Sequence, residues 1–128
     1  GLHFQWNPPM GKLMRVTVGE AFAVAVDIRK GSPTLGQWYG RKISAADRLQ
    51  IWAPAGFARG FCALSDHVEL QNKCTGTYNS GAESGILWSD PQIGVEWPVE
   101  QPQLSAKDAQ AQTLSEWLQR PESDQFTY

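Results

Sequence analysis

The sequence has few of the residues that metal sites, disulfide frameworks and membrane spans require. Its 128 residues include two histidines and two cysteines, and no apolar run approaches the roughly 18 residues of a membrane helix. The histidines do not form a His-x-His pattern, so we expect no metal site. The net charge of −2 argues against nucleic acid as a partner. No phosphate-binding glycine loop and no secretory signal is visible.

The two cysteines predict free thiols. Cys62 and Cys74 each stand in a short β-like run, and neither has a partner at C-x-x-C spacing. We expect both thiols to be buried and reduced, which favours a cytoplasmic location.

Short apolar runs separated by turn residues predict an all-β fold. Turn signals recur roughly every eight to twelve residues, as in a sandwich or barrel, and no βαβ unit is visible. The pattern therefore indicates an antiparallel β-sandwich. The expected strands cover residues 2–6, 12–18, 21–28, 37–43, 49–52, 57–64, 68–75 and 85–88, with one short helical turn at 44–47.

The end of the chain changes to helical spacing. Apolar residues recur with the period of a helix between residues 104 and 120, at Leu104, Ala111, Leu114, Trp117 and Leu118. We expect one or two short helices docked outside the sheets. The chain is thus divided into a β-sandwich core at 1–100 and a helical tail at 101–128.

Two groups near the start of the chain can carry proton chemistry. His3 stands in the alternating run 2–6, and Lys12 begins the next strand after the turn Asn7-Pro8-Pro9. An imidazole exchanges protons near neutral pH, and a lysine can stabilise an enolate oxygen. Each residue is also compatible with an exposed strand position that has no chemical role.

An ordered set of motifs resembles the dTDP-4-dehydrorhamnose 3,5-epimerases. Taken singly the motifs are not decisive, but they follow the family's order from residue 1 to about residue 110. They are Gly1-Leu2-His3-Phe4-Gln5, Gly11-Lys12-Leu13, Asp27-Ile28-Arg29-Lys30-Gly31-Ser32-Pro33-Thr34, Gly36-Gln37-Trp38, Pro54-Ala55-Gly56-Phe57-Ala58, Lys73-Cys74-Thr75, Asp90-Pro91 and Leu104-Ser105-Ala106-Lys107-Asp108. The resemblance implies a cupin-type jelly-roll β-sandwich.

The resemblance also implies an activity and roles for individual residues. The expected protein is a cofactor-independent isomerase, which epimerises a nucleotide-linked 4-keto-6-deoxy sugar for rhamnose and cell-surface polysaccharide biosynthesis. His3 would remove a proton beside the C4 carbonyl, Asp108 would orient His3, and Lys12 would stabilise the enolate. Asp108 also fits the first turn of a helix, and the two interpretations are not exclusive. The matching positions predict substrate contacts from Gln5, Arg59, Asn72, Tyr78 and Glu83.

Two positions depart from the family pattern. Arg59 replaces a family His; it cannot shuttle a proton at neutral pH, although it can hold an oxyanion or a phosphate. Asn72 replaces a family Tyr, and an amide has no proton to give. Inversion needs a proton removed on one face and returned on the other, from water or from Tyr78, which also fits a packing role. The alternatives are a single-carbon epimerase acting at C3 or C5, or a non-catalytic sugar-nucleotide-binding homologue.

The resemblance further implies a homodimer and a segment before residue 1. In the family that segment belongs to the sheet, the dimer contact and the substrate site. The sequence starts without Met and inside a predicted strand. We therefore expect a fragment, a processed form or part of the native protein.

Overall fold

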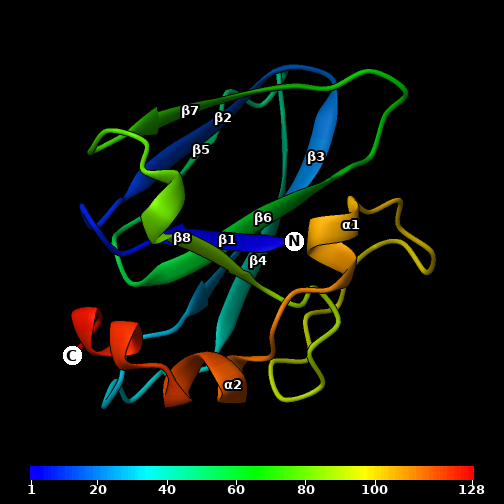
Figure 1. Ribbon diagram of the computed structural model, residues 1–128. Coiled ribbons are helices and arrows are strands. Elements are labelled where there is room, and N and C mark those ends of the chain that lie inside the picture. Colours follow the sequence, from blue (N-terminus) through cyan, green and yellow to red (C-terminus); the bar gives the residue numbers. More distant parts are fainter.

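Eight strands form two antiparallel sheets in the computed structural model, which describes residues 1–128 (Figure 1). The strands are β1 (Leu2–Gln5), β2 (Lys12–Val18), β3 (Glu20–Asp27), β4 (Trp38–Ser44), β5 (Gln50–Ala53), β6 (Phe57–Ala63), β7 (Glu69–Cys74) and β8 (Glu83–Ile86). One sheet has five strands in the order β4-β3-β6-β1-β8, and the other has three in the order β5-β2-β7. The predicted β-sandwich is confirmed.

The observed strands lie within a few residues of the predicted ranges, and the chain makes a single turn at 45–47 that does not extend into a helix. At residues 44–47 the amide of Ser44 donates to Asp47 Oδ2, and the amide of Asp47 donates to Ser44 Oγ, both at 3.1 Å. This exchange resembles a helix cap. Arg48 then adopts a φ of 57°, which leaves the helical region, so the chain turns directly into β5.

The inner strand β3 separates two apolar clusters. It pairs with β4 along one edge and with β6 along the other, so its backbone is hydrogen-bonded on both edges. Val24 and Val26 face the larger cluster, whereas the small residues Ala21 and Ala23 face the space between the sheets. These alanines pack in a smaller apolar cluster with Met14, Val16 and Ile43, beside the cavity described below.

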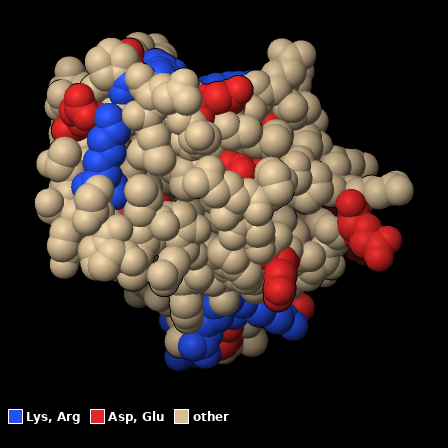
Figure 2. Space-filling view, turned by 90° about the horizontal axis from the view of Figure 1, so that it is seen from below, with Lys and Arg blue, Asp and Glu red and all other residues tan.

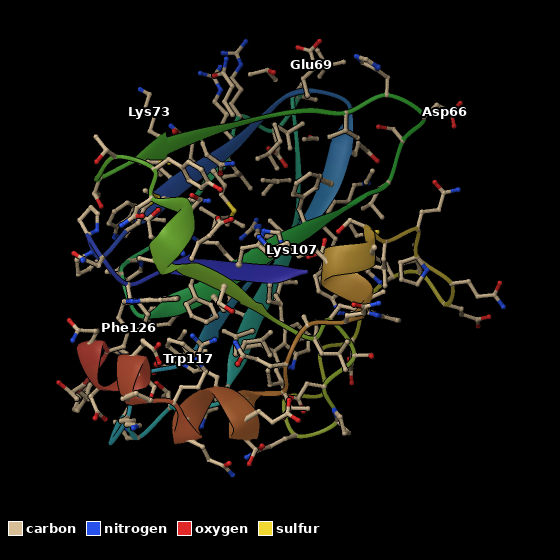
Figure 3. The ribbon with its side chains drawn as sticks, viewed as in Figure 1. Asp66, Glu69, Lys73, Lys107, Trp117 and Phe126 are labelled. Carbon is tan, nitrogen blue, oxygen red and sulfur yellow. The ribbon has the colours of Figure 1, made fainter.

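The tail covers the outer face of the five-stranded sheet. It contains α1 (Ala106–Ala109), α2 (Leu114–Gln119) and the 3-10 helix η2 (Pro121–Gln125); another 3-10 helix, η1 (Ser80–Ala82), precedes β8. Trp117 is fully buried, and its ring centroid lies 4.5 Å from that of Phe4 on β1. Trp117 and Phe126 extend from the tail toward the strands (Figure 3). The prediction of short helices docked outside the sheets is confirmed.

The cysteine prediction is confirmed in one respect and wrong in another. Both thiols are free, but Cys62 is only half-buried and Cys74 is exposed. For Cys74 the reason is topological, because β7 is an edge strand of the three-stranded sheet and most of its side chains reach solvent.

The outer surface is mixed in charge. On the face seen in Figure 2, basic and acidic side chains are separated by wide uncharged areas, and no single sign dominates it. None of the helices combines the length and the apolar character needed to cross a lipid bilayer.

Candidate active site

A cavity of about 610 Å³ lies between the two sheets. The five-stranded sheet contributes His3 and Arg59 to its wall, and the three-stranded sheet contributes Lys12 and Asn72. Asp108 reaches the same cavity from α1, which lies beside the start of β1 (Figure 1). Residues far apart in the sequence therefore meet inside the sandwich.

Strand alternation explains why the polar residues point inward. Leu2 and Phe4 belong to the outer apolar cluster, so His3 between them faces the opposite side of the sheet. His3 pairs in register with Arg59 on β6, and directly paired residues share a face. The imidazole and the guanidinium therefore face the same cavity.

His3 and Asp108 form the closest polar pair of the cavity. His3 Nε2 lies 2.6 Å from Asp108 Oδ1. Burial opposes ionisation of Asp108, but the hydrogen bond and the charge of His3 outweigh it and lower the pKa of the carboxyl. A carboxylate accepts the proton of Nε2 and leaves Nδ1 as the basic nitrogen, which is the tautomer a general base needs.

The helix start at Asp108 and its pairing with His3 coexist, as expected. Ser105 is the N-cap of α1, and its Oγ accepts a hydrogen bond of 3.1 Å from the amide of Asp108. The cap places Asp108 in the first turn, with its carboxylate toward His3. The main-chain nitrogen of Gly1 lies 3.3 Å from Asp108 Oδ2 and supports the same orientation.

The glycine before the motif histidine makes room for this pair. A methyl group on Gly1 would overlap the Asp108 carboxylate and would lie 2.8 Å from His3 Nε2. Gly60 has a related role on β6, because a methyl group there would overlap the carbonyl oxygen of Gly1. The sequence pattern predicts no role for either glycine, although the position of Gly1 two residues before His3 is a usable signal.

Two cations, Lys12 and Arg59, line the same cavity, and neither forms an ion pair. Burial lowers the pKa of Lys12, and the nearby charge of Arg59 lowers it further. Burial also lowers the pKa of Arg59 to about 10, so the guanidinium stays charged at neutral pH. This part of the cavity is suited to an anionic group.

Gln5 does not line the cavity, and its substrate contact stays a prediction. Its side chain is buried and donates to the carbonyl oxygens of Pro8 and Thr77, both at 3.0 Å. Its Oε1 accepts from the amide of Asn79 at 2.9 Å. Gln5 faces the same side as His3, but it lies where the connecting loops close the sandwich, so it braces these loops.

Asn72, Tyr78 and Glu83 have different surroundings. Asn72 lines the cavity opposite the five-stranded sheet. Tyr78 and Glu83 lie outside the cavity lining, in a surface cluster where Glu83 Oε1 accepts from Tyr78 at 2.8 Å and from Lys107 at 2.9 Å. Their positions give no support to a direct substrate contact, because the cluster satisfies its own polar groups.

The segment between β8 and α1 covers one side of the cavity, which sequence reasoning did not foresee. Trp88, Trp97 and Leu104 line the cavity from this segment, and Trp97 Nε1 donates to the carbonyl oxygen of Trp88 at 2.8 Å. The abundance of tryptophan was visible in the sequence, but not which rings reach the site. No group of three or more His, Cys, Asp and Glu side chains is close enough to hold a metal ion.

Comparison with known proteins extends this description. A dTDP-4-dehydrorhamnose 3,5-epimerase of Shigella flexneri is 54% identical over 113 residues, which are 88% of this chain and 62% of that protein. A dTDP-4-dehydrorhamnose 3-epimerase of Streptomyces niveus is 38% identical over 117 residues, 91% of this chain and 56% of that protein.

A solved structure is similar over nearly the whole chain. The crystal structure of dTDP-6-deoxy-D-glucose-3,5-epimerase from Legionella pneumophila Philadelphia 1, in complex with dTDP-4-keto-L-rhamnose, has a TM-score of 0.90 and 48% identity, covering 96% of this chain and 65% of that one. The chain therefore spans less than two thirds of each of these three proteins. The family model described as dTDP-4-dehydrorhamnose 3,5-epimerase matches residues 1–116. On the fold, the cavity and these matches together, the chain belongs to the dTDP-4-dehydrorhamnose 3,5-epimerase family.

Proposed function

We propose that this chain carries the catalytic cavity of an isomerase that epimerises a dTDP-linked 4-keto-6-deoxy sugar. The observation that carries the proposal is the His3–Asp108 pair, held at 2.6 Å in the wall of a cavity that also presents two cations without counter-ions. The relatives named above are epimerases of such sugars, which supports the same substrate class.

The chemistry follows from the carbonyl of the substrate. The C4 carbonyl acidifies the neighbouring C–H bonds, so His3 takes the proton and the bonding electron pair moves to the carbonyl oxygen. Lys12 stabilises the resulting enolate by charge. Return of a proton to the opposite face inverts the carbon. Asp108 holds the imidazole in the basic tautomer throughout.

A narrower activity is favoured by one observation. Asn72 faces the cavity at the position where the resembled family has its tyrosine acid, and an amide cannot deliver a proton. Return of the proton then depends on water, which supports epimerisation at one carbon only. The Streptomyces niveus relative is named a 3-epimerase, acting at a single position.

Proton NMR in deuterated water distinguishes a double epimerase from a single-carbon epimerase. The native-length protein is incubated with dTDP-4-keto-6-deoxyglucose, and the C3 and C5 proton signals are followed. Loss of both signals with conversion supports the double epimerase, and loss of one supports the single-carbon enzyme. Binding without exchange at either carbon would refute the enzyme and leave a sugar-nucleotide-binding protein.

The two histidines provide a matched pair of variants for this test. His3→Asn removes the proposed base and should abolish exchange, whereas His67→Asn changes an imidazole that is 73% exposed and lies outside the cavity lining. Equal exchange by the two variants would exclude His3 as the base.

We also propose a homodimer in the cytoplasm. Tyr39 and Trp52 are 55% and 52% exposed, which supports a partner surface on this side of the sandwich. The free state of Cys62 and Cys74 suits a reducing compartment. Light scattering of the native-length protein across a concentration series would test the dimer; a constant monomer mass would refute it.

A further inference from the structure

Arg59 is a buried cation with unfilled hydrogen-bond donors. Its side chain is 3% exposed. Nη1 donates to the carbonyl oxygens of Phe57 at 2.8 Å and His3 at 3.4 Å, and Nη2 donates to that of Met10. A guanidinium has five N–H donors, so these bonds leave some unused, and Nε has no partner. Burying a charge without a counter-ion is costly, which indicates a role in binding an anion.

The position of Arg59 places its charge beside the backbone of the proposed base. The guanidinium contacts the backbone of His3 and that of Met10, two residues before Lys12. Arg59 also pairs with His3 across the β1–β6 ladder. Lys12 lines the same cavity, and the charge of Arg59 contributes to lowering the pKa of Lys12. The two cations and the imidazole therefore line one and the same cavity.

The chemistry of the substrate separates two possible anions. A nucleotide-linked 4-keto sugar carries its diphosphate on C1, which lies across the ring from C4. The enolate oxygen is on C4, next to the carbon that loses its proton to His3. A cation beside His3 is therefore suited to the oxygen on C4, whereas the diphosphate would lie at the far end of the sugar.

We propose that Arg59 acts with Lys12 as a two-cation site for the enolate oxygen of the substrate; this inference rests on the proposed function. In the step, the C–H proton moves to His3 and the C–H electron pair forms the C=C bond. The carbonyl π pair moves to oxygen, and Arg59 and Lys12 hold that oxyanion without losing a proton. Because arginine is always charged at neutral pH, this site does not titrate as the family's histidine would.

Replacement of Arg59 by methionine, lysine and histidine tests the inference. The deuterium-exchange rate at saturating 4-keto sugar is measured together with the Kd of dTDP, which carries the diphosphate but no sugar carbonyl. Loss of one oxyanion donor typically lowers kcat by about 10²-fold. We expect a loss of this order in Arg59→Met with the Kd of dTDP changed by less than about twofold. Arg59→Lys should recover part of the rate, because lysine keeps the positive charge. The recovery should be incomplete, because lysine lacks the planar, bidentate donors of the guanidinium.

Arg59→His adds a readout that a structural role would not produce. Its exchange rate should fall as pH rises through the titration of the imidazole, around pH 6.5, relative to the native protein at each pH. Arg15→Met is the matched control, because Arg15 is an exposed arginine of β2 that does not line the cavity. If Arg59→Met does not fold, the lysine and histidine variants carry the test.

Several outcomes would overturn the inference. A dTDP Kd raised more than about tenfold in Arg59→Met, with the saturated exchange rate retained, would assign Arg59 to the diphosphate. An unchanged rate and an unchanged Kd would remove Arg59 from the reaction. Native protein that binds dTDP but exchanges neither proton would refute the proposed function itself, and the inference with it.

Discussion

Asp108→Asn is the sharpest test of the His3–Asp108 pair. The change keeps the size of the side chain and leaves the main-chain bond to the Ser105 cap in place, but it removes the negative charge at 2.6 Å from His3 Nε2. Without that charge, the imidazolium formed during proton abstraction loses its stabilising partner. We therefore expect kcat to fall while the affinity for dTDP is retained.

The size of the effect follows from the hydrogen bond. A hydrogen bond to a charged group contributes about 1.5–3 kcal/mol, and each 1.4 kcal/mol or so of barrier is a factor of ten in rate. Because the His3 side chain is 43% exposed and that of Asp108 is 17% exposed, solvent screens the pair. We expect the lower part of this range, a loss of about 10- to 50-fold in the rate of deuterium exchange.

Ser105→Ala is the control for Asp108→Asn. It removes the cap of α1 but keeps the carboxylate, and loss of an N-cap costs about 1 kcal/mol of helix stability. If Ser105→Ala lowers the exchange rate as much as Asp108→Asn, the carboxylate acts through helix position and not through its charge. An unchanged rate in Asp108→Asn would refute the reasoning directly.

Three further changes test how the site and the core are held. Gly1→Ala should displace the Asp108 carboxylate and slow exchange with little change in Tm, and an unaltered rate would contradict the steric argument. Asp27 is buried; burial opposes its ionisation, but hydrogen bonds, of which that from Arg29 has the largest effect, outweigh it and place its pKa well below the ordinary 3.8. The ionised Asp27 stabilises the fold above pH 3.8, and this stabilisation is lost as pH falls toward the folded-state pKa. Asp27→Asn should therefore lower the free energy of unfolding at pH 7 by about 3 kcal/mol. In urea unfolding, the difference in stability between the native protein and Asp27→Asn should narrow below pH 3.8. A stability difference that does not change with pH would exclude this stabilising role of the Asp27 charge. Trp117→Ala should cost about 3–5 kcal/mol in the same assay, because the ring is fully buried against β1, and a cost below 1 kcal/mol or so would show that the tail is not part of the core.

The fold locates its chemistry between the sheets and its larger apolar cluster outside them. Val24 and Val26 pack against the tail, whereas the alanines of β3 face inward. A sandwich interior packed along its whole length would leave no space for the cavity of about 610 Å³. The tail adds apolar burial on the outer face of the sheet, where Leu114 and Trp117 are completely buried.

The sequence by itself determined the strands and which side chains share a face. A strand turns successive side chains to opposite sides, so the apolar neighbours Leu2 and Phe4 already placed His3 on the other face. Turn residues marked most strand ends, because their backbone preferences are also local. The order of the motifs indicated the family and the residue types of the site. The capping pattern at Ser44 indicated the turn at 44–47, but it does not reveal the positive φ of Arg48 that ends this turn.

Only the tertiary structure decided which distant residues meet. Asp108 is 105 residues from His3 in the sequence, and their contact depends on where α1 packs against the start of β1. The burial of Arg59 with Nε left without a partner likewise depends on tertiary packing. So do the hydrogen bonds by which Gln5 holds the loops at Pro8 and Thr77. The backbone dictates periodicity within a few residues, whereas long-range contacts depend on how whole elements pack, which no local pattern encodes.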